Sequence, residues 1–243
     1  MEVPKWLERT ALLTGEATIQ NLTKAHILLV GLGGVGSFAG EFLVRAGIGK
    51  ITIIDGDTVD ITNINRQLQA VTSTIGLSKS ELLKARFIDI NPDIEVIAYD
   101  RFLEPEDMAS LLENSKFDYI LDCIDSVTPK LTLLNIAKRK KLTIISSMGA
   151  GGKLDPSKIR IGDISTTKEC KFAQSLRKRL KRDNIKRGIK VVFSEEIQPK
   201  DALKLTDGKN YKKSYYGTIS YMPALFGLTM ASEVIRVIGD LKK

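Results

Sequence analysis

Residues 31–37 read Gly-Leu-Gly-Gly-Val-Gly-Ser, and this glycine turn constrains the fold more than any other feature of the chain. The apolar run of residues 25–30 before it is typical of a buried parallel strand, and residues 35–45 after it carry apolar side chains at helical spacing. Glycines between a strand and a helix let backbone N–H groups approach a phosphate at the positive end of the helix dipole. The turn residues predicted to hold a nucleotide are Gly31, Gly33, Gly34, Gly36 and Ser37.

A second predicted strand, residues 50–55, ends in Asp55. In dinucleotide-binding folds a carboxylate about 20 residues beyond the glycine turn holds a ribose hydroxyl. These features fit NAD and ATP equally well. A glycine turn that only packs a helix against a strand is also an open interpretation at this point.

Two cations favour ATP. Arg66 follows the second strand within the polar segment 60–69, and Lys79 lies at the start of a predicted helix over residues 78–90. Both side chains would reach the carboxyl edge of the sheet, where ligands of such folds bind, and an arginine can bind phosphate oxygens in a bidentate manner. Each cation alone could equally be a solvated surface charge. Together with Asp55 and the turn, they predict a triphosphate site.

A third apolar run, residues 117–124, is followed directly by Asp125 and Ser126. A carboxylate beside a triphosphate is a natural ligand for Mg²⁺, so we expect Asp125 to bind the metal and Asp122, within the strand, to be structural. The alternative is that Asp125 caps a helix beginning near Thr128 and Pro129.

These motifs together resemble the ATP-dependent adenylating enzymes of the ThiF/MoeB/HesA and ubiquitin-activating type, over residues 9–147. The resemblance implies that Asp55 holds the ribose, that Asp125 holds Mg²⁺ and that a substrate carboxylate attacks the α-phosphate of ATP. It also implies that Arg9 crosses a homodimer interface to the partner's ATP, although Arg9 could instead be a surface charge on an amphipathic first helix. The further nucleotide-binding residues on this basis are Asp57, Asn63, Arg66, Gln67, Lys79 and Ser126, with Arg66, Lys79, Asp125 and Arg9 as the catalytic set.

The cysteines and the single histidine limit the chemistry further. The chain has only Cys123 and Cys170, so it lacks the four thiolates of a structural zinc site. We expect Cys123 to be buried and inert, whereas Cys170 lies among lysines that could lower its pKa or be near it by chance. His26, at the start of a strand, is expected to be structural.

Residues 168–190 contain ten basic and two acidic residues, and this segment accounts for the whole excess of 8 positive charges in the chain. Such a run is often a solvated helix face, but beside a nucleotide site it also favours a polyanionic partner. The candidate nucleic-acid residues are Arg177, Lys178, Arg179, Lys181 and Arg182.

Motifs at residues 66–70, 90–92, 122–130, 147–156 and 217–223 narrow the resemblance to the tRNA threonylcarbamoyladenosine dehydratases. That branch implies adenylation of the threonyl carboxylate of a modified tRNA adenosine, closure of a hydantoin ring and release of AMP and pyrophosphate. Its implied partners are tRNA, a second copy of the chain and a sulfur-transfer protein. The alternatives are adenylation of the tail of a ubiquitin-like sulfur carrier and a non-catalytic sensor of ATP or NAD.

The predicted fold is a single α/β domain over residues 1–243, with a doubly wound, Rossmann-like, mostly parallel sheet and a C-terminal antiparallel extension. Residues 168–190 form its basic, tRNA-facing segment, and the polar residues 198–215 are expected to be a mobile loop. The apolar run in the last helix, residues 220–238, is expected to be too short for a bilayer. With no leader sequence evident and few cysteines, we expect a cytoplasmic protein that has no membrane partner.

Overall fold

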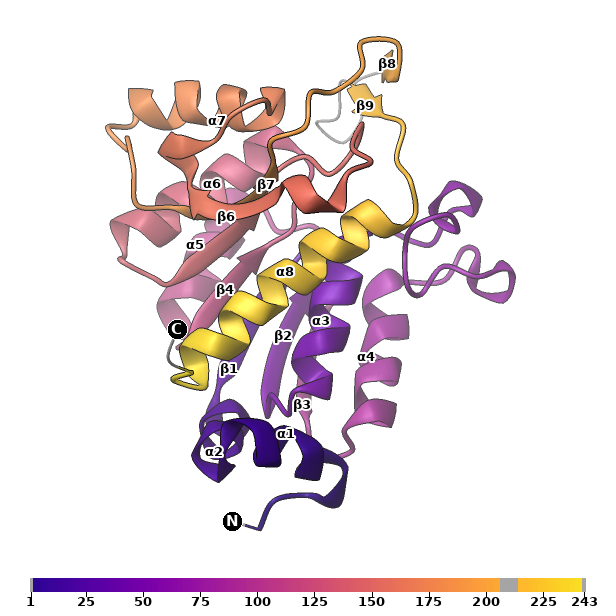
Figure 1. Cartoon of the computed structure of the whole chain (residues 1–243), viewed down its shortest axis with the longest axis vertical. Coiled ribbons are helices and arrows are strands. Elements are labelled where there is room, and N and C mark those ends of the chain that lie inside the picture. Colours follow the sequence, from indigo (N-terminus) through magenta and orange to yellow (C-terminus); the bar gives the residue numbers. More distant parts are fainter. Residues whose placement is uncertain (1, 206–213, 242–243) are drawn as a thin grey trace.

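The computed structural model describes residues 2–205 and 214–241 and shows a seven-stranded sheet between two layers of helices (Figure 1). The strands follow the order β3-β2-β1-β4-β5-β7-β6 across the sheet. Their bounds are β1 His26–Val30, β2 Lys50–Ile54, β3 Glu95–Tyr99, β4 Tyr119–Asp122, β5 Ile144–Ser147, β6 Ile159–Asp163 and β7 Lys190–Ser194.

All neighbouring strands are parallel except β6, which runs antiparallel to β7 at the edge. At the centre, Leu29 of β1 aligns with Ile53 of β2 and Leu121 of β4, and all three are fully buried. Strands covered on both faces need continuous apolar sequences rather than alternating ones, which explains the apolar runs in the sequence. The predicted mostly parallel α/β sheet with an antiparallel extension is therefore confirmed.

Different sets of helices cover the two faces of the sheet. Helices α3, α4 and α8 contribute to one apolar core, and α5, α6 and α7 contribute to the other (Figure 1). The helix bounds are α1 Glu8–Thr14, α2 Glu16–Lys24, α3 Gly36–Arg45, α4 Lys79–Ile90, α5 Pro105–Asn114, α6 Val127–Arg139, α7 Lys171–Arg182 and α8 Tyr221–Ile238. Short 3₁₀ turns occupy Lys5–Leu7, Ile61–Asn63, Thr72–Thr74, Pro156–Lys158 and Ile164–Thr166.

Helix α8 returns from the end of the chain to the centre of the molecule. Within the described residues it alone is long and apolar enough to span a membrane by length and composition, with 18 residues and a mean hydropathy of 1.2. Its side chains Met222, Phe226 and Met230 are fully buried against α3 and the sheet. Contrary to expectation, length and composition therefore do not exclude a membrane span, and we interpret α8 as a core helix because these side chains are buried.

The segment 198–215, expected to be a mobile loop, contains one strand and the start of another in its described part. Leu203–Leu205 (β8) and Ser214–Tyr216 (β9) form an antiparallel pair apart from the main sheet. Residues 206–213 of the expected loop lie outside the described residues. The mobility of the segment therefore stays a prediction.

Candidate active site

The glycine turn lies where β1 ends and α3 begins, at the carboxyl edge of the sheet. Gly31 has a φ of 89° and donates its N–H to Ile54 O of β2 at 2.9 Å. A side chain at Gly36 would place its Cβ 1.8 Å from Gly31 O, so only glycine permits this reversal. A Cβ at Gly33 would meet only the Gln67 side chain, at 3.7 Å. The turn is therefore closed on the core side and open at Gly33, whereas a Cβ at Gly34 would lie 3.0 Å from Arg66 O.

Asp55 joins the glycine turn to the end of β2. Its carboxylate accepts the Leu32 N–H at 2.6 Å and the Asp57 N–H at 2.8 Å, and the residue is 8% exposed. Burial raises the pKa of Asp55, and the nearby Lys79 charge and these two hydrogen bonds oppose that rise. The carboxylate thus lies directly beneath the turn, as a ribose-binding residue would.

Lys79 is the first residue of α4, and Ser78 caps this helix by accepting the Glu81 N–H at 3.2 Å. The Lys79 side chain is 5% exposed, and its Nζ lies 3.0 Å from Asp57 Oδ2. A nearly buried ammonium with one carboxylate partner keeps donors for a phosphate. The structure thus brings Lys79 and the two carboxylates Asp55 and Asp57 together.

The segment after β2 brings three predicted residues to the same edge. Asn63 Oδ1 accepts the Asp60 N–H at 3.2 Å and fixes the 3₁₀ turn that precedes Arg66. The Arg66 guanidinium donates to Thr62 O at 2.8 Å and to Asn65 Oδ1 at 2.7 Å. Burial lowers the pKa of Arg66, and the Asp125 charge raises it, which places these two opposite charges near each other.

Gln67 completes this group of residues beside the turn. It is 8% exposed, and its Oε1 is buried without a hydrogen-bond partner. Ser37, the other polar residue predicted to face the nucleotide, is fully buried, and its Oγ accepts the Leu68 N–H at 3.3 Å. The observed role of Ser37 is thus to join α3 to the Arg66 segment.

The loop after β4 is fixed by a buried ion pair. Lys130 Nζ lies 2.8 Å from Asp122 Oδ2, and both side chains are fully buried. Asp122 also accepts the Ser146 Oγ–H at 2.7 Å and the Ile124 N–H at 3.1 Å, while Lys130 donates to Ile124 O at 2.9 Å. The structural role expected for Asp122 is therefore confirmed, and the pair sets the path of the chain toward Asp125.

Asp125 is exposed at the carboxyl edge, beside the start of α6. The N-cap of α6 is Ser126, which forms no side-chain capping bond, and its Oγ lies 3.4 Å from Asp125 Oδ1. The N-cap position thus falls on Ser126 rather than on Asp125. Among the described residues no group of three or more metal-binding side chains occurs, so a metal here would take further ligands from a bound substrate or water.

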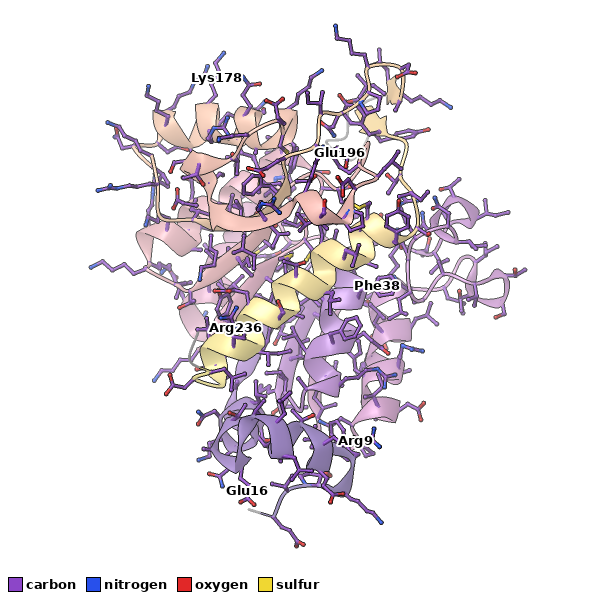
Figure 2. The ribbon with its side chains drawn as sticks, viewed as in Figure 1. Arg9, Glu16, Phe38, Lys178, Glu196 and Arg236 are labelled. Atoms are coloured by element: carbon purple, nitrogen blue, oxygen red, sulfur yellow. The ribbon has the colours of Figure 1, made fainter. Side chains whose placement is uncertain are left out.

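Arg9 does not join the site formed in its own chain by the glycine turn, Asp55, Lys79, Arg66 and Asp125, which we call the crevice. It is exposed on α1, and α1 and α2 precede β1, whereas the glycine turn follows β1. Figure 2 shows Arg9 at the end of the molecule formed by the two N-terminal helices. A role for Arg9 in ATP binding therefore requires a second copy of the chain.

Cys123 is half-buried rather than buried as expected, and Cys170 is buried. Burial raises the pKa of the Cys123 thiol, and Cys170 caps α7 with its Sγ accepting the Ala173 N–H at 3.5 Å. His26 Nε2 forms a hydrogen bond with Thr52 Oγ1 at 2.8 Å, and the centroids of the His26 and Phe117 rings lie 4.6 Å apart. These contacts agree with the structural interpretation of Cys123 and His26.

The candidate nucleic-acid residues lie on α7, but they differ in orientation. Arg177 is half-buried and donates to Thr167 O at 3.0 Å and to Thr167 Oγ1, so its guanidinium is engaged within the chain. Lys178 points outward from the helix (Figure 2). The other exposed members of the set are Arg179, Lys181 and Arg182.

Two residues beside the crevice escaped prediction. The side-chain amide of Gln69 donates a hydrogen bond to Leu32 O at 2.7 Å and so helps to fix the glycine turn. In the sequence, Lys130 looks like an ordinary lysine of an exposed helix. The feature that could have indicated its role is its position in the first turn of the helix that follows Asp122. Both roles depend on tertiary contacts.

The buried pair generates a stability prediction. Lys130→Met leaves Asp122 charged and unpaired, so the free energy of unfolding should fall by about 3–5 kcal/mol. Adding Asp122→Asn should restore part of the loss, because asparagine keeps an acceptor for the Ile124 N–H without the charge. Guanidinium unfolding followed by circular dichroism measures both. The control Lys140→Met removes an exposed ion pair with Glu113 and should lower the free energy of unfolding by less than about 1 kcal/mol. An equally small loss for Lys130→Met would contradict this account.

Comparison with known proteins places this geometry in a family. The ThiF family model matches residues 7–243. The tRNA threonylcarbamoyladenosine dehydratases of Escherichia coli K12 and Bacillus subtilis 168 are 38% and 37% identical, over 95% and 93% of this chain and 93% and 92% of theirs. The crystal structure of the E. coli enzyme in complex with ATP aligns with a TM-score of 0.87 at 36% identity, covering 98% of this chain and 97% of that chain. The chain therefore belongs to the ThiF family.

Proposed function

We propose that this protein is an ATP-dependent tRNA threonylcarbamoyladenosine dehydratase. The observation that carries the proposal is the convergence of Asp55, Lys79, Arg66 and Asp125 at one edge of the sheet, beside the glycine turn. Relatives that share almost the whole length carry this enzyme name, and one of them is solved with ATP. The relatives named as sulfurtransferases match only 56–63% of this chain, which makes the sulfur-carrier alternative weaker.

The proposed reaction has two steps. In the first, an oxygen of the threonyl carboxylate attacks the α-phosphorus of ATP, and the bond to the β-phosphate oxygen breaks to release pyrophosphate. In the second, the neighbouring carbamoyl nitrogen attacks the activated carbonyl carbon, loses its proton and expels AMP. The hydantoin ring forms with net loss of water, and that oxygen leaves within AMP.

The side chains supply positioning and charge rather than covalent chemistry. The nucleophile is already an anion, so the first step needs no general base. Lys79 and Arg66 would neutralise the charge that grows on the polyphosphate, and preorganised charges of this kind lower the barrier most where water is excluded. The buried position of Lys79 suits that role.

Asp125 is the residue that would hold a Mg²⁺ ion when a nucleotide is bound. Mg²⁺ bound with nucleotides keeps several waters and takes one or two carboxylates, so one exposed carboxylate at the crevice suffices. The ion would offset phosphate charge when ATP is bound.

The proposed active form is a homodimer in which Arg9 reaches the partner's crevice. On α1, next to Arg9, the apolar side chains of Leu12 and Leu13 are 82% and 86% exposed. Contiguous exposed apolar side chains are typical of a protein interface. An Arg9 that lies far from its own crevice agrees with a contribution in trans.

Lys79→Ala should lower the turnover of threonylcarbamoylated tRNA by roughly two orders of magnitude, because one preorganised cation is lost. Mass spectrometry of tRNA nucleosides, with AMP and pyrophosphate measured in parallel, reports the cyclised product. Lys84→Ala on the same helix is the control and should be nearly silent. Absence of cyclised nucleoside with the unmodified protein would overturn the proposed function.

Asp125→Asn should raise the Mg²⁺ concentration needed for half-maximal rate by at least about tenfold, because one anionic ligand is lost. A Mg²⁺ titration of pyrophosphate release at fixed ATP measures the shift. The exposed Asp93→Asn serves as the charge-matched control. An unchanged Mg²⁺ requirement would show that Asp125 does not bind the metal.

Mixing Arg9→Ala with Lys79→Ala should give more activity than the sum of the two separate proteins. Each mixed dimer then holds one crevice with an intact Lys79 and an intact Arg9 from the other chain. Sedimentation velocity establishes the dimer, and tRNA turnover measures the rescue. A monomer in solution, or activity that never exceeds the sum, would contradict a contribution in trans.

A further inference from the structure

A basic groove lies where the carboxyl ends of α6 and α7 meet, outside the crevice described above. Its volume is about 540 Å³, and it is lined by Lys138, Arg139, Asn184, Ile185, Lys186 and Arg187. Four of these six residues are cations and none is acidic. Lys186 and Arg187 fall within the basic segment 168–190 that the sequence predicted to face tRNA, whereas Lys138 and Arg139 on α6 lie outside it.

The loop that carries two of these cations is held in place from both sides. Lys138 Nζ donates to Gly188 O at 3.2 Å, and Asp163 accepts the Gly188 N–H at 2.5 Å. Gly188 has a φ of 89°, which favours glycine at this bend. The groove therefore presents its charges from a fixed backbone rather than a free tail.

The cations of the groove are available to an external anion. Arg139, Lys186 and Arg187 are exposed, and no carboxylate in the described part of the chain forms an ion pair with them. The neighbouring Asp183 accepts a hydrogen bond from Asn135 Nδ2 at 3.0 Å. Unpaired like charges in a concave surface repel one another and create a positive potential that attracts anions.

The helix dipole explains the presence of only some of the four cations in the groove. Cations in the last turn of a helix interact favourably with its dipole, which suffices for Lys138 and Arg139 on α6. Lys186 and Arg187 lie beyond the end of α7, so the dipole accounts for them less well. A requirement for an anionic ligand accounts for all four.

Helix α7 connects this groove to the crevice. Its first turn contacts the loop after β5 at the carboxyl edge, where a Cβ at Gly149 would lie 3.6 Å from Phe172. Its last turn leads through the groove loop into the start of β7, at the opposite edge. Twelve helical residues span about 18 Å, and exposed lysines and arginines line this path. A nucleic-acid strand carries a phosphate every few ångströms, so the path matches several phosphates.

We propose that the α6–α7 groove is a second docking site for tRNA, which binds backbone phosphates of the stem while the modified base occupies the crevice. This inference rests on the proposed function. The groove would add affinity and register without touching the reacting atoms, since phosphate contacts position a nucleic acid and carry no sequence information.

The test measures tRNA affinity of the full-length protein by fluorescence anisotropy across a series of salt concentrations. Lys186→Glu with Arg187→Glu should weaken binding roughly tenfold or more and reduce the salt slope by about two. ATP affinity and the single-turnover rate at saturating tRNA should stay within about twofold. The matched control, Lys24→Glu with Arg236→Glu, makes the same charge change at exposed sites on α2 and α8 and should keep the affinity of the unmodified protein.

Each outcome separates the two proposals. Equal affinity and salt slope for the groove and control variants would overturn the groove as a docking site, even with full dehydratase activity. A groove variant whose rate falls at saturating tRNA would also overturn it, because the cations would then act at the crevice. If the unmodified protein does not cyclise the threonylcarbamoyl group of the tRNA, the proposed function is overturned. The affinity data would still test whether the groove binds tRNA. Arg139→Gln with Lys186→Gln repeats the test without charge reversal if the first variant does not fold.

Discussion

The backbone of the glycine turn passes so close to itself that a single Cβ at Gly36 would lie 1.8 Å from Gly31 O, and the arrangement of the crevice depends on this approach. It lets α3 begin directly beneath the end of β1. Helix α8 then packs against the same turn, with Gly227 so close to Val35 O that a Cβ would lie 2.3 Å away. Asp55 locks the arrangement through the Leu32 N–H. One backbone constraint thus positions the glycine turn proposed to hold phosphate, the core helix α8 and the carboxylate of Asp55.

Two cations and their neighbouring carboxylates lie at the crevice. Lys79 is held by Asp57, and Arg66 lies near Asp125. Asp57 orients Lys79, and hydrogen bonds to Thr62 O and Asn65 Oδ1 orient the Arg66 guanidinium, so both cations are positioned before substrate binds. The fully buried Asp122–Lys130 pair beneath them serves a different purpose, since it fixes the loop that carries Asp125. Lys130 also lies 5.8 Å from the Phe172 ring centroid, so the base of the crevice contacts the first turn of the basic helix.

The sequence predicted features that depend on neighbours in the chain. Short-range patterns set the glycine turn, the strand that leads into Asp55 and the start of the helix that carries Lys79, and all three occur where expected. Tertiary contacts set the rest. Arg177 turns inward because Thr167 lies beneath it, and Lys130 is buried because Asp122 and Ser146 converge there. The groove joins residues about 50 positions apart, which no local pattern encodes.

The central claim is that a tRNA carboxylate is joined to the α-phosphate of ATP in this crevice. The most direct measurement uses tRNA whose threonyl carboxylate carries ¹⁸O at both oxygens, with mass spectrometry of the released nucleotides. The account predicts one ¹⁸O atom in AMP and none in pyrophosphate for each ring closed. Label in a phosphate product other than AMP, or unlabelled AMP with full ring closure, would contradict it.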